Sequence, residues 1–121
     1  MKKILVIDDE EQILNLVTFI LKKNKFKVIT AMNGHEGIEK AGSEKPDLII
    51  MDIMMPEIDG FEATEIIKMN HTTKDIPILI LSSAARMDSK MKGIESGAID
   101  YLTKPFDKKE LIEKIDQILK I

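Results

Sequence analysis

The sequence contains no cysteine, which excludes disulfide bonds, thiolate metal sites and a cysteine nucleophile. It also lacks a long apolar segment near its start. The first apolar run, Ile4–Ile7, follows Lys2 and Lys3 and is far too short for a signal-peptide core or a membrane span. These absences predict a soluble, cytoplasmic protein that does not enter the membrane.

The sequence also lacks an excess of positive charge. It has 18 Lys and Arg against 21 Asp and Glu, a net charge of −3, and Lys and Glu are scattered along the chain. No basic face large enough to hold a nucleic-acid backbone is evident, so we expect no direct nucleic-acid binding by this domain. The densest basic run indicates a solvated helix end and an edge strand, and consists of Lys22, Lys23, Lys25 and Lys27.

With 121 residues and 44% hydrophobic content, the chain fits one compact domain over residues 1–121. A chain of this size buries about two-thirds of its unfolded surface. Its apolar residues fall in short runs. Residues 4–7, 47–51 and 76–81 are almost uninterrupted Ile, Leu, Val and Met, which is typical of strands buried on both faces of a parallel sheet. Residues 26–31 and 99–103 are weaker runs that predict edge strands.

Segments of helical period separate these strands. The first and last helices show apolar residues at helical spacing, whereas the predicted helices over 34–43, 60–69 and 86–96 are shorter and less regular. Five β-α units predict an α/β fold: a doubly wound, five-stranded parallel sheet of the flavodoxin-like kind with strand order 2-1-3-4-5. The last helix is Lys-rich and no linker follows it, which favours a stand-alone protein.

Polar residues close the apolar runs. Asp8 and Asp9 follow the first, Asp52 the third, Ser82 the fourth and Lys104 the fifth. Ligands of such folds lie beyond the carboxyl ends of the strands, where the strand order reverses, and there strands one and three are neighbours. Three clustered carboxylates repel one another unless a cation neutralises them, and oxygen ligands favour Mg²⁺ or Mn²⁺. With the Lys104 ammonium, such a crevice is a receptacle for a phosphoryl group, and a carboxylate can itself accept that group.

The chain resembles a response-regulator receiver domain of two-component signalling, of the chemotaxis-regulator-like kind. Four segments carry the resemblance: KILVIDDE at 3–10, PDLIIMDIMMPEIDGFE at 46–62, PILILSSA at 77–84 and GAIDYLTKPF at 97–106. The resemblance implies that Asp52 accepts the phosphoryl group and that Ser82 and Lys104 contact it. It also implies a cis bond between Lys104 and Pro105.

The resemblance further implies a Mg²⁺ site. Asp9 and Asp52 would be direct ligands, Asp8 would act through water, and the backbone carbonyl of Met54 would complete the protein ligands. Tyr101 matches the aromatic switch position. When Ser82 moves to the phosphoryl group, Tyr101 would turn inward and change the face formed by the fourth helix, fifth strand and fifth helix.

The resemblance implies a signalling domain rather than an enzyme with a substrate of its own. The phosphoryl donor would be a phosphohistidine on a sensor histidine kinase or a histidine phosphotransfer protein. The output would be a downstream protein partner or a fused output domain, reached by a population shift. The domain would be a monomer or a phosphorylation-dependent dimer.

Other interpretations remain open. An acid after a strand is often only a helix cap, and Asp9 or Glu10 could serve the first helix in that way. A flavodoxin-type FMN binder shares the strand order, but acids after its first strand would repel the phosphate. A haloacid-dehalogenase-type phosphatase needs a second Asp where this sequence has Met54. The remaining alternative is a protein-binding module that works without phosphorylation.

Overall fold

Five parallel strands form one sheet in the order β2-β1-β3-β4-β5, as the sequence predicts. The computed structural model describes residues 1–83 and 89–121, with side chains described except at 89–92. The strands span, in chain order, Lys3–Ile7 (β1), Lys27–Ala31 (β2), Leu48–Asp52 (β3), Ile78–Ser83 (β4) and Asp100–Lys104 (β5). Every residue of β3 is buried, whereas β2 and β5 are only partly covered. This difference explains why the edge strands have weaker apolar runs.

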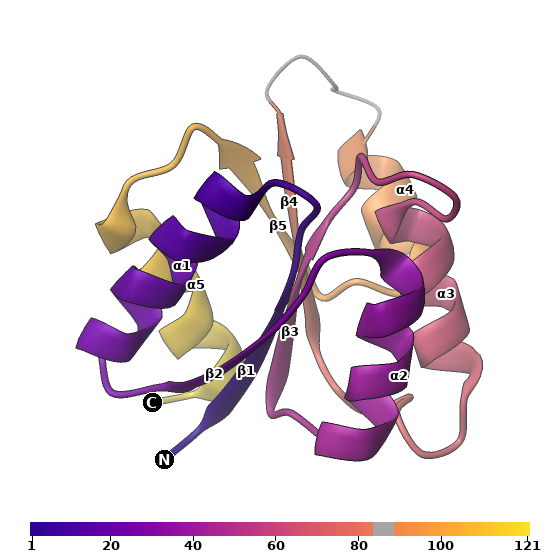
Figure 1. Cartoon of the computed structure of the whole chain (residues 1–121), viewed down its shortest axis with the longest axis horizontal. Coiled ribbons are helices and arrows are strands. Elements are labelled where there is room, and N and C mark those ends of the chain that lie inside the picture. Colours follow the sequence, from indigo (N-terminus) through magenta and orange to yellow (C-terminus); the bar gives the residue numbers. More distant parts are fainter. Residues whose placement is uncertain (84–88) are drawn as a thin grey trace.

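Helices cover both faces of the sheet (Figure 1). They span Glu11–Lys23 (α1), Gly34–Glu44 (α2), Gly60–Met69 (α3), Ser89–Ser96 (α4) and Lys108–Leu119 (α5). Helices α1 and α5 lie on one face, and α2, α3 and α4 lie on the other. The predicted helix over 86–96 is observed from Ser89 onward, and residues 86–88 lie outside the described residues. The doubly wound arrangement is therefore confirmed.

The two faces carry separate apolar cores because successive strand residues point to opposite sides of the sheet. On the α1/α5 side, Ile4, Val6 and Ile50 pack with buried residues of those helices. On the other side, Leu5 and Ile7 pack with the buried faces of α2 and α3. This alternation also decides the side to which the polar residues at the strand ends point.

Short polar side chains begin three of the helices. Asn33 and Asp59 each accept a hydrogen bond from the backbone N–H three residues on, at 2.8 and 2.9 Å. Asp107 and Glu110 form a reciprocal capping box at the start of α5. Such caps satisfy N–H groups that have no partner within the helix and contribute about 1 kcal/mol each. They fix where the chain turns after β2, β3 and β5.

Two buried threonines near α3 differ in their hydrogen bonding. Thr73 Oγ1 donates to the Ile67 carbonyl at 2.7 Å, whereas Thr64 Oγ1 is the one buried side-chain polar atom without a partner among the described residues. We expect Thr64→Val to leave the free energy of unfolding unchanged or to raise it by up to about 1 kcal/mol, because no hydrogen bond is lost. Thr73→Val should lower it by about 1–3 kcal/mol. Urea unfolding of both variants measures the difference, and equal losses would contradict this assignment.

Candidate functional site

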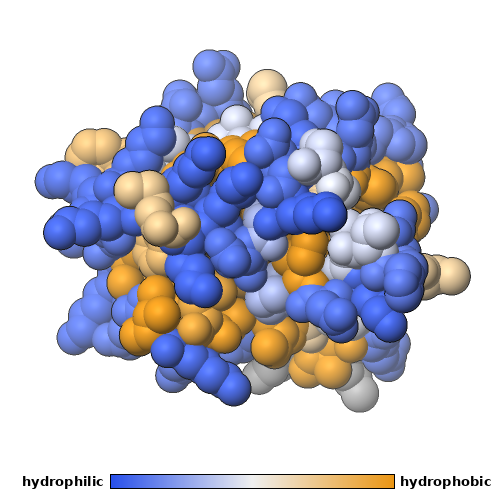
Figure 2. All heavy atoms as spheres, turned by 90° about the horizontal axis from the view of Figure 1, so that it is seen from below, coloured by the Kyte–Doolittle hydropathy of each residue, from blue (hydrophilic) through white to orange (hydrophobic). Residues whose placement is uncertain are grey.

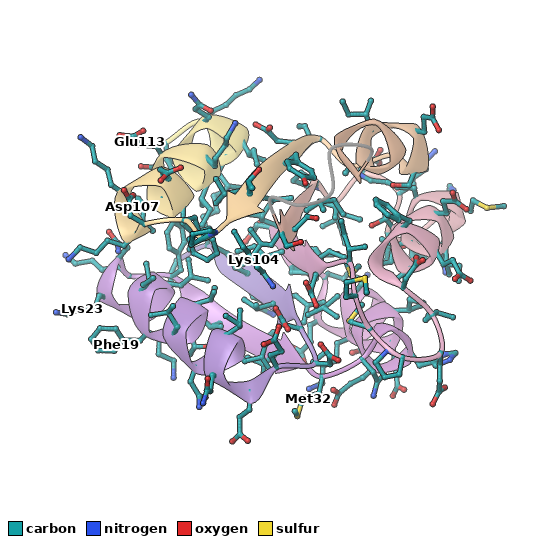
Figure 3. All side chains as sticks on the ribbon, turned by 90° about the horizontal axis from the view of Figure 1, so that it is seen from above. Phe19, Lys23, Met32, Lys104, Asp107 and Glu113 are labelled. Carbon is teal, nitrogen blue, oxygen red and sulfur yellow. The ribbon has the colours of Figure 1, made fainter. Side chains whose placement is uncertain are left out.

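Three polar side chains meet where β1, β3 and β5 end. Lys104 Nζ lies 3.0 Å from Asp52 Oδ1 and 3.4 Å from Asp8 Oδ2. Asp8 is 1% exposed and Asp52 5% exposed, so both carboxylates are almost completely removed from solvent. Figure 3 shows Lys104 reaching inward at this end of the molecule, and Figure 1 shows that both chain termini lie at the opposite end. The predicted grouping of Asp8, Asp52 and Lys104 is present.

Burial and mutual repulsion shift the protonation of this group. Burial raises the pKa of Asp52 to about 6, and the neighbouring charge of Asp8 acts in the same direction, against the lowering effect of Lys104. Burial also raises the pKa of Asp8, although the Glu10 N–H and Lys104 partly offset it. For Lys104, burial lowers the pKa, but the attraction of Asp52 and Asp8 outweighs it and the net pKa is raised. Burial therefore disfavours the ionised form of both acids, and the Lys104 ammonium offsets this only in part.

The loop after β1 adds two more acids. Carboxylate oxygens of Asp8, Asp9 and Glu10 lie within 4.8 Å of one another, and Asp9 and Glu10 are exposed. Glu10 occupies the N-cap position of α1 but makes no side-chain capping hydrogen bond. Instead, Asp8 Oδ1 accepts a hydrogen bond from the Glu10 backbone N–H at 2.9 Å. The alternative in which Glu10 serves only as a side-chain cap of α1 is therefore wrong.

Ser82 and Tyr101 belong to neighbouring strands. Tyr101 pairs with Ile80 in the ladder between β4 and β5, and Ser82 is two residues beyond Ile80, on the same face of the sheet. Ser82 is 3% exposed and Tyr101 is half-buried against the core that includes Ile80. Because the two side chains share this face of the sheet, a movement of Ser82 would change the surroundings of Tyr101.

The loop after β3 approaches the site closely at Gly60. The sequence pattern does not predict this close approach. Gly60 begins α3 after the Asp59 cap, as its pattern predicts, and its N–H donates to the Ile53 carbonyl at 2.9 Å. A Cβ at Gly60 would collide with the backbone carbonyl of Asp52. In the same loop, the Met54 side chain is 60% exposed and therefore does not pack in the core.

An apolar cavity lies directly beside the acidic group. It has a volume of about 390 Å³, and its lining residues are Ile13, Leu16, Ser83, Lys104, Pro105 and Phe106. Leu16 is 50% exposed. The bond between Lys104 and Pro105 is cis, as the sequence resemblance implies. Lys104 therefore belongs both to this apolar cavity and to the acidic group.

Comparisons with known proteins agree with this geometry. The family model of the response regulator receiver domain matches residues 4–116. The transcriptional regulator PhoP of Bacillus subtilis is 42% identical over 98% of this chain, but the chain spans only about half of that protein (49%). PilH of Pseudomonas aeruginosa is 38% identical, and 98% of each chain is covered.

Solved structures of response-regulator and receiver-domain proteins are also similar to this chain. The chemotaxis response regulator CheY4 of Vibrio cholerae has a TM-score of 0.92 and 34% identity, with 98% of this chain and 99% of that chain covered. The receiver domain of the sensor histidine kinase PA1611 of Pseudomonas aeruginosa, described with a magnesium ion in its active-site cleft, has a TM-score of 0.91 and 25% identity, with 99% and 98% covered.

Receiver domains are signalling modules rather than enzymes that turn over a separate substrate. Among the described residues, no helix has the length and apolar character needed to cross a membrane. Three observations indicate the same family: the flavodoxin-like sheet, the acids at its carboxyl edge and the family match over residues 4–116. The chain belongs to the response-regulator receiver domains of two-component signalling.

Proposed function

We propose that this receiver domain is switched by phosphorylation of Asp52. The observation that carries the proposal is the buried Asp52 carboxylate 3.0 Å from Lys104. An acid that served only as solvated surface would not need to be buried beside a cation, because burial of a charge is costly unless it is paired. Perturbed acids of this kind cluster at functional sites. We further propose that residues 1–121 act as one receiver domain.

Transfer of the phosphoryl group requires mainly that the protein position the reacting groups and stabilise their charge. The Asp52 carboxylate attacks the phosphorus of a phosphohistidine, so that an O–P bond forms while the N–P bond breaks. The imidazole nitrogen keeps the electron pair and takes a proton from solvent. Lys104 contacts Oδ1 of Asp52, which leaves Oδ2 to form the new bond. Lys104 then neutralises part of the phosphoryl charge as a compact cation.

The carboxylates also fit a hard divalent cation. Carboxylate oxygens of Asp8, Asp9 and Glu10 lie within 4.8 Å of one another, and Asp8 and Asp52 contact the same Lys104 ammonium, so several acids gather around one cation. We propose that Asp8, Asp9, Asp52 and the carbonyl of Met54 hold Mg²⁺, for which Mn²⁺ could substitute. When bound, Mg²⁺ offsets negative charge on the phosphoryl oxygens. The magnesium described in the PA1611 receiver supports this assignment.

Magnesium should therefore stabilise the fold. At about 10 mM Mg²⁺ and a dissociation constant of about 1 mM, ligand linkage adds about 1.4 kcal/mol to the free energy of unfolding. We expect Asp9→Asn to lose most of this gain, whereas Glu11→Gln, an exposed acid in the first turn of α1, should retain it. Thermal unfolding followed by circular dichroism, with Mg²⁺ and with a chelator, gives the comparison. An equal Mg²⁺ effect in Asp9→Asn would remove Asp9 from the ligand set.

Ser82 and Tyr101 are the proposed switch. The Ser82 hydroxyl would turn toward a phosphoryl oxygen, and Tyr101 would then turn inward and change the face of α4, β5 and α5. The shared sheet face of Ser82 and Tyr101 supports this coupling. That face would bind a downstream protein or a fused output domain, as a monomer or as a phosphorylation-dependent dimer. We propose a cytoplasmic location for the domain and its phosphoryl donor.

The donor is proposed to be a histidine kinase or a histidine phosphotransfer protein that rests on the apolar cavity beside Lys104. We expect Leu16→Glu to slow transfer from the phosphorylated partner protein by about tenfold or more, because a charge replaces buried apolar contact. Phosphorylation by acetyl phosphate, which needs no docking surface, should change less than about twofold. Ile66→Glu, at an exposed apolar position on α3, is the control (43% exposed, against 50% for Leu16). Equal slowing with both donors would contradict a docking role for Leu16.

The competing function is a protein-binding module that works without phosphorylation. Incubation with a phosphoryl donor and Mg²⁺, followed by borohydride, distinguishes the two. An aspartyl phosphate is reduced at its acyl carbon, so the modified residue can be identified by peptide mass mapping, whereas a chain with no modified residue would favour the phosphorylation-independent module. We expect the modification at Asp52. Modification at Asp8 or Asp9 would overturn the assignment of the acceptor.

A further inference from the structure

A second groove lies between α1 and α5 and shares no lining residue with the acidic site. Its volume is about 380 Å³, within the range of about 300–1,000 Å³ typical of ligand-sized cavities. Phe19, Ile20 and Ile112 supply its apolar surface. Phe19 is 60% exposed, which is unusual for an aromatic ring unless something covers it. Figure 3 shows Phe19 and Lys23 on α1 and Glu113 on α5 along the same side of the molecule.

Lysines surround this apolar surface. Lys23, Lys108 and Lys109 line the groove, and Glu113 is its one acidic lining residue within the described part of the chain. Lys23 Nζ lies 5.3 Å from the centroid of the Phe19 ring, so the cation and the ring form one composite surface. The groove therefore combines an apolar surface with an excess of positive charge, although the chain as a whole is acidic.

The two acids at the start of α5, Asp107 and Glu110, do not line the groove. Asp107 accepts a hydrogen bond from the Glu110 N–H at 2.8 Å, and Glu110 accepts one from the Asp107 N–H at 3.4 Å. Both carboxylates are thus engaged in capping α5, and neither residue lines the groove. The lysine rim, which consists of Lys23, Lys108 and Lys109, is therefore available to a ligand from outside the chain.

We propose that the groove between α1 and α5 binds an acidic, amphipathic segment of a partner protein, with an apolar side chain beside Phe19 and carboxylates on the lysine rim. An amphipathic helix laid in a groove between helices is a recurrent mode of peptide recognition. Apolar contact would supply most of the affinity, and the lysines would supply specificity and steering. This surface is additional to the proposed phosphorylation and does not depend on it.

Other occupants fit less well. In a two-fold symmetric contact with a second copy, the same patch meets itself, so the rims of Lys23, Lys108 and Lys109 would face one another and repel. A nucleic acid needs a basic stripe that follows its backbone. Here a net charge of −3, aliphatic Ile20 and Ile112, and Glu113 on the rim oppose such binding.

The test uses the unphosphorylated, Mg²⁺-free chain, so that its outcome is separate from that of the proposed function. The probe is a blocked amphipathic helical peptide with leucines on one face and flanking glutamates, titrated while amide chemical shifts of the ¹⁵N-labelled protein are recorded. We expect the largest shifts at residues lining the groove. The double variant Lys23→Glu/Lys109→Glu should weaken binding by about tenfold, because two favourable charge contacts become repulsive.

The matched control is Lys22→Glu, which makes the same charge change at an exposed position next to Lys23 that does not line the groove. It should change the affinity by less than about twofold. Phe19→Ala, which truncates an exposed ring, should weaken binding while leaving the thermal midpoint unchanged. Equal weakening by Lys22→Glu, or equal binding of a peptide with Gln in place of Glu, would overturn the proposal. Tighter binding of an oligothymidylate, or concentration-dependent shifts of the same amides without peptide, would also overturn it.

Discussion

Asp52→Asn is expected to be more stable than the wild-type chain in metal-free buffer at pH 7. The pKa of Asp52 is raised from 3.8 to about 6 by burial and by Asp8, so its ionised form is disfavoured in the folded state. A shift of this size corresponds to roughly 3 kcal/mol, a net value that already includes the opposing attraction of Lys104. We therefore expect a gain of up to about 3 kcal/mol in the free energy of unfolding, measured by urea titration.

The pH dependence of the free energy of unfolding gives an independent measure of the unfavourable ionisation of Asp52. Because the folded pKa of Asp52 exceeds the unfolded value, the folded chain binds more protons between about pH 4 and pH 6. The contribution of Asp52 to stability is present below pH 4 and is lost as the pH rises through about 6. Asp52→Asn should lack this component, although Asp8, whose pKa is also raised, contributes with the same sign.

The control for both measurements is Asp75→Asn, which removes one negative charge from an exposed position. It should change the free energy of unfolding by less than about 0.5 kcal/mol. A loss of stability in Asp52→Asn, or an equal gain in Asp75→Asn, would mean that burial and the charge of Asp8 do not disfavour ionised Asp52 in the folded chain.

Gly60→Ala is expected to destabilise the chain by about 2–4 kcal/mol and to slow phosphorylation by acetyl phosphate by at least tenfold. The added Cβ would collide with the Asp52 backbone carbonyl, so the loop or the end of β3 must move, and overpacking against rigid backbone is costly. A small displacement of a reacting group is sufficient for a large loss of rate. Urea unfolding and intact mass against time measure the two effects.

Gly42→Ala provides the matched comparison on α2. A Cβ at Gly42 meets nothing within 4 Å, and Ala is favoured over Gly inside a helix by about 0.5–1 kcal/mol. This variant should therefore gain stability and be phosphorylated at the wild-type rate. If Gly60→Ala behaved in the same way, Gly60 would have no part in positioning Asp52.

Apolar runs and helical periodicity predicted five β-α units, because buried strands of a parallel sheet consist of unbroken apolar runs. The strand order then followed from the doubly wound fold that this alternation indicates. The same strand ends placed Asp8, Asp52 and Lys104 in one crevice, and the structure brings them together. The separation of a site at the carboxyl edge from the termini at the other end follows from the β-α alternation. The general form of the site was therefore accessible from the sequence.

Features that depend on side-chain packing were not accessible. The pattern identified Gly60 only as the start of a helix, because the approach of its backbone to Asp52 depends on how the loop after β3 folds back. The lysine run indicated solvated positions, and Lys22, Lys23, Lys25 and Lys27 are indeed exposed. Yet Lys23 also lines a groove with residues of α5, far away in the sequence. Such pairings arise only when α1 and α5 pack on one face of the sheet.

The most direct test of the proposed switch is the intact mass of the chain after incubation with acetyl phosphate, with and without Mg²⁺, for the wild type and for Asp52→Asn. We predict a Mg²⁺-dependent gain of one phosphoryl group in the wild type and no gain in Asp52→Asn. A phosphoryl group of equal occupancy in Asp52→Asn, or a wild-type chain that gains none from acetyl phosphate or from a panel of phosphorylated histidine kinases, would contradict the assignment of Asp52 as the acceptor.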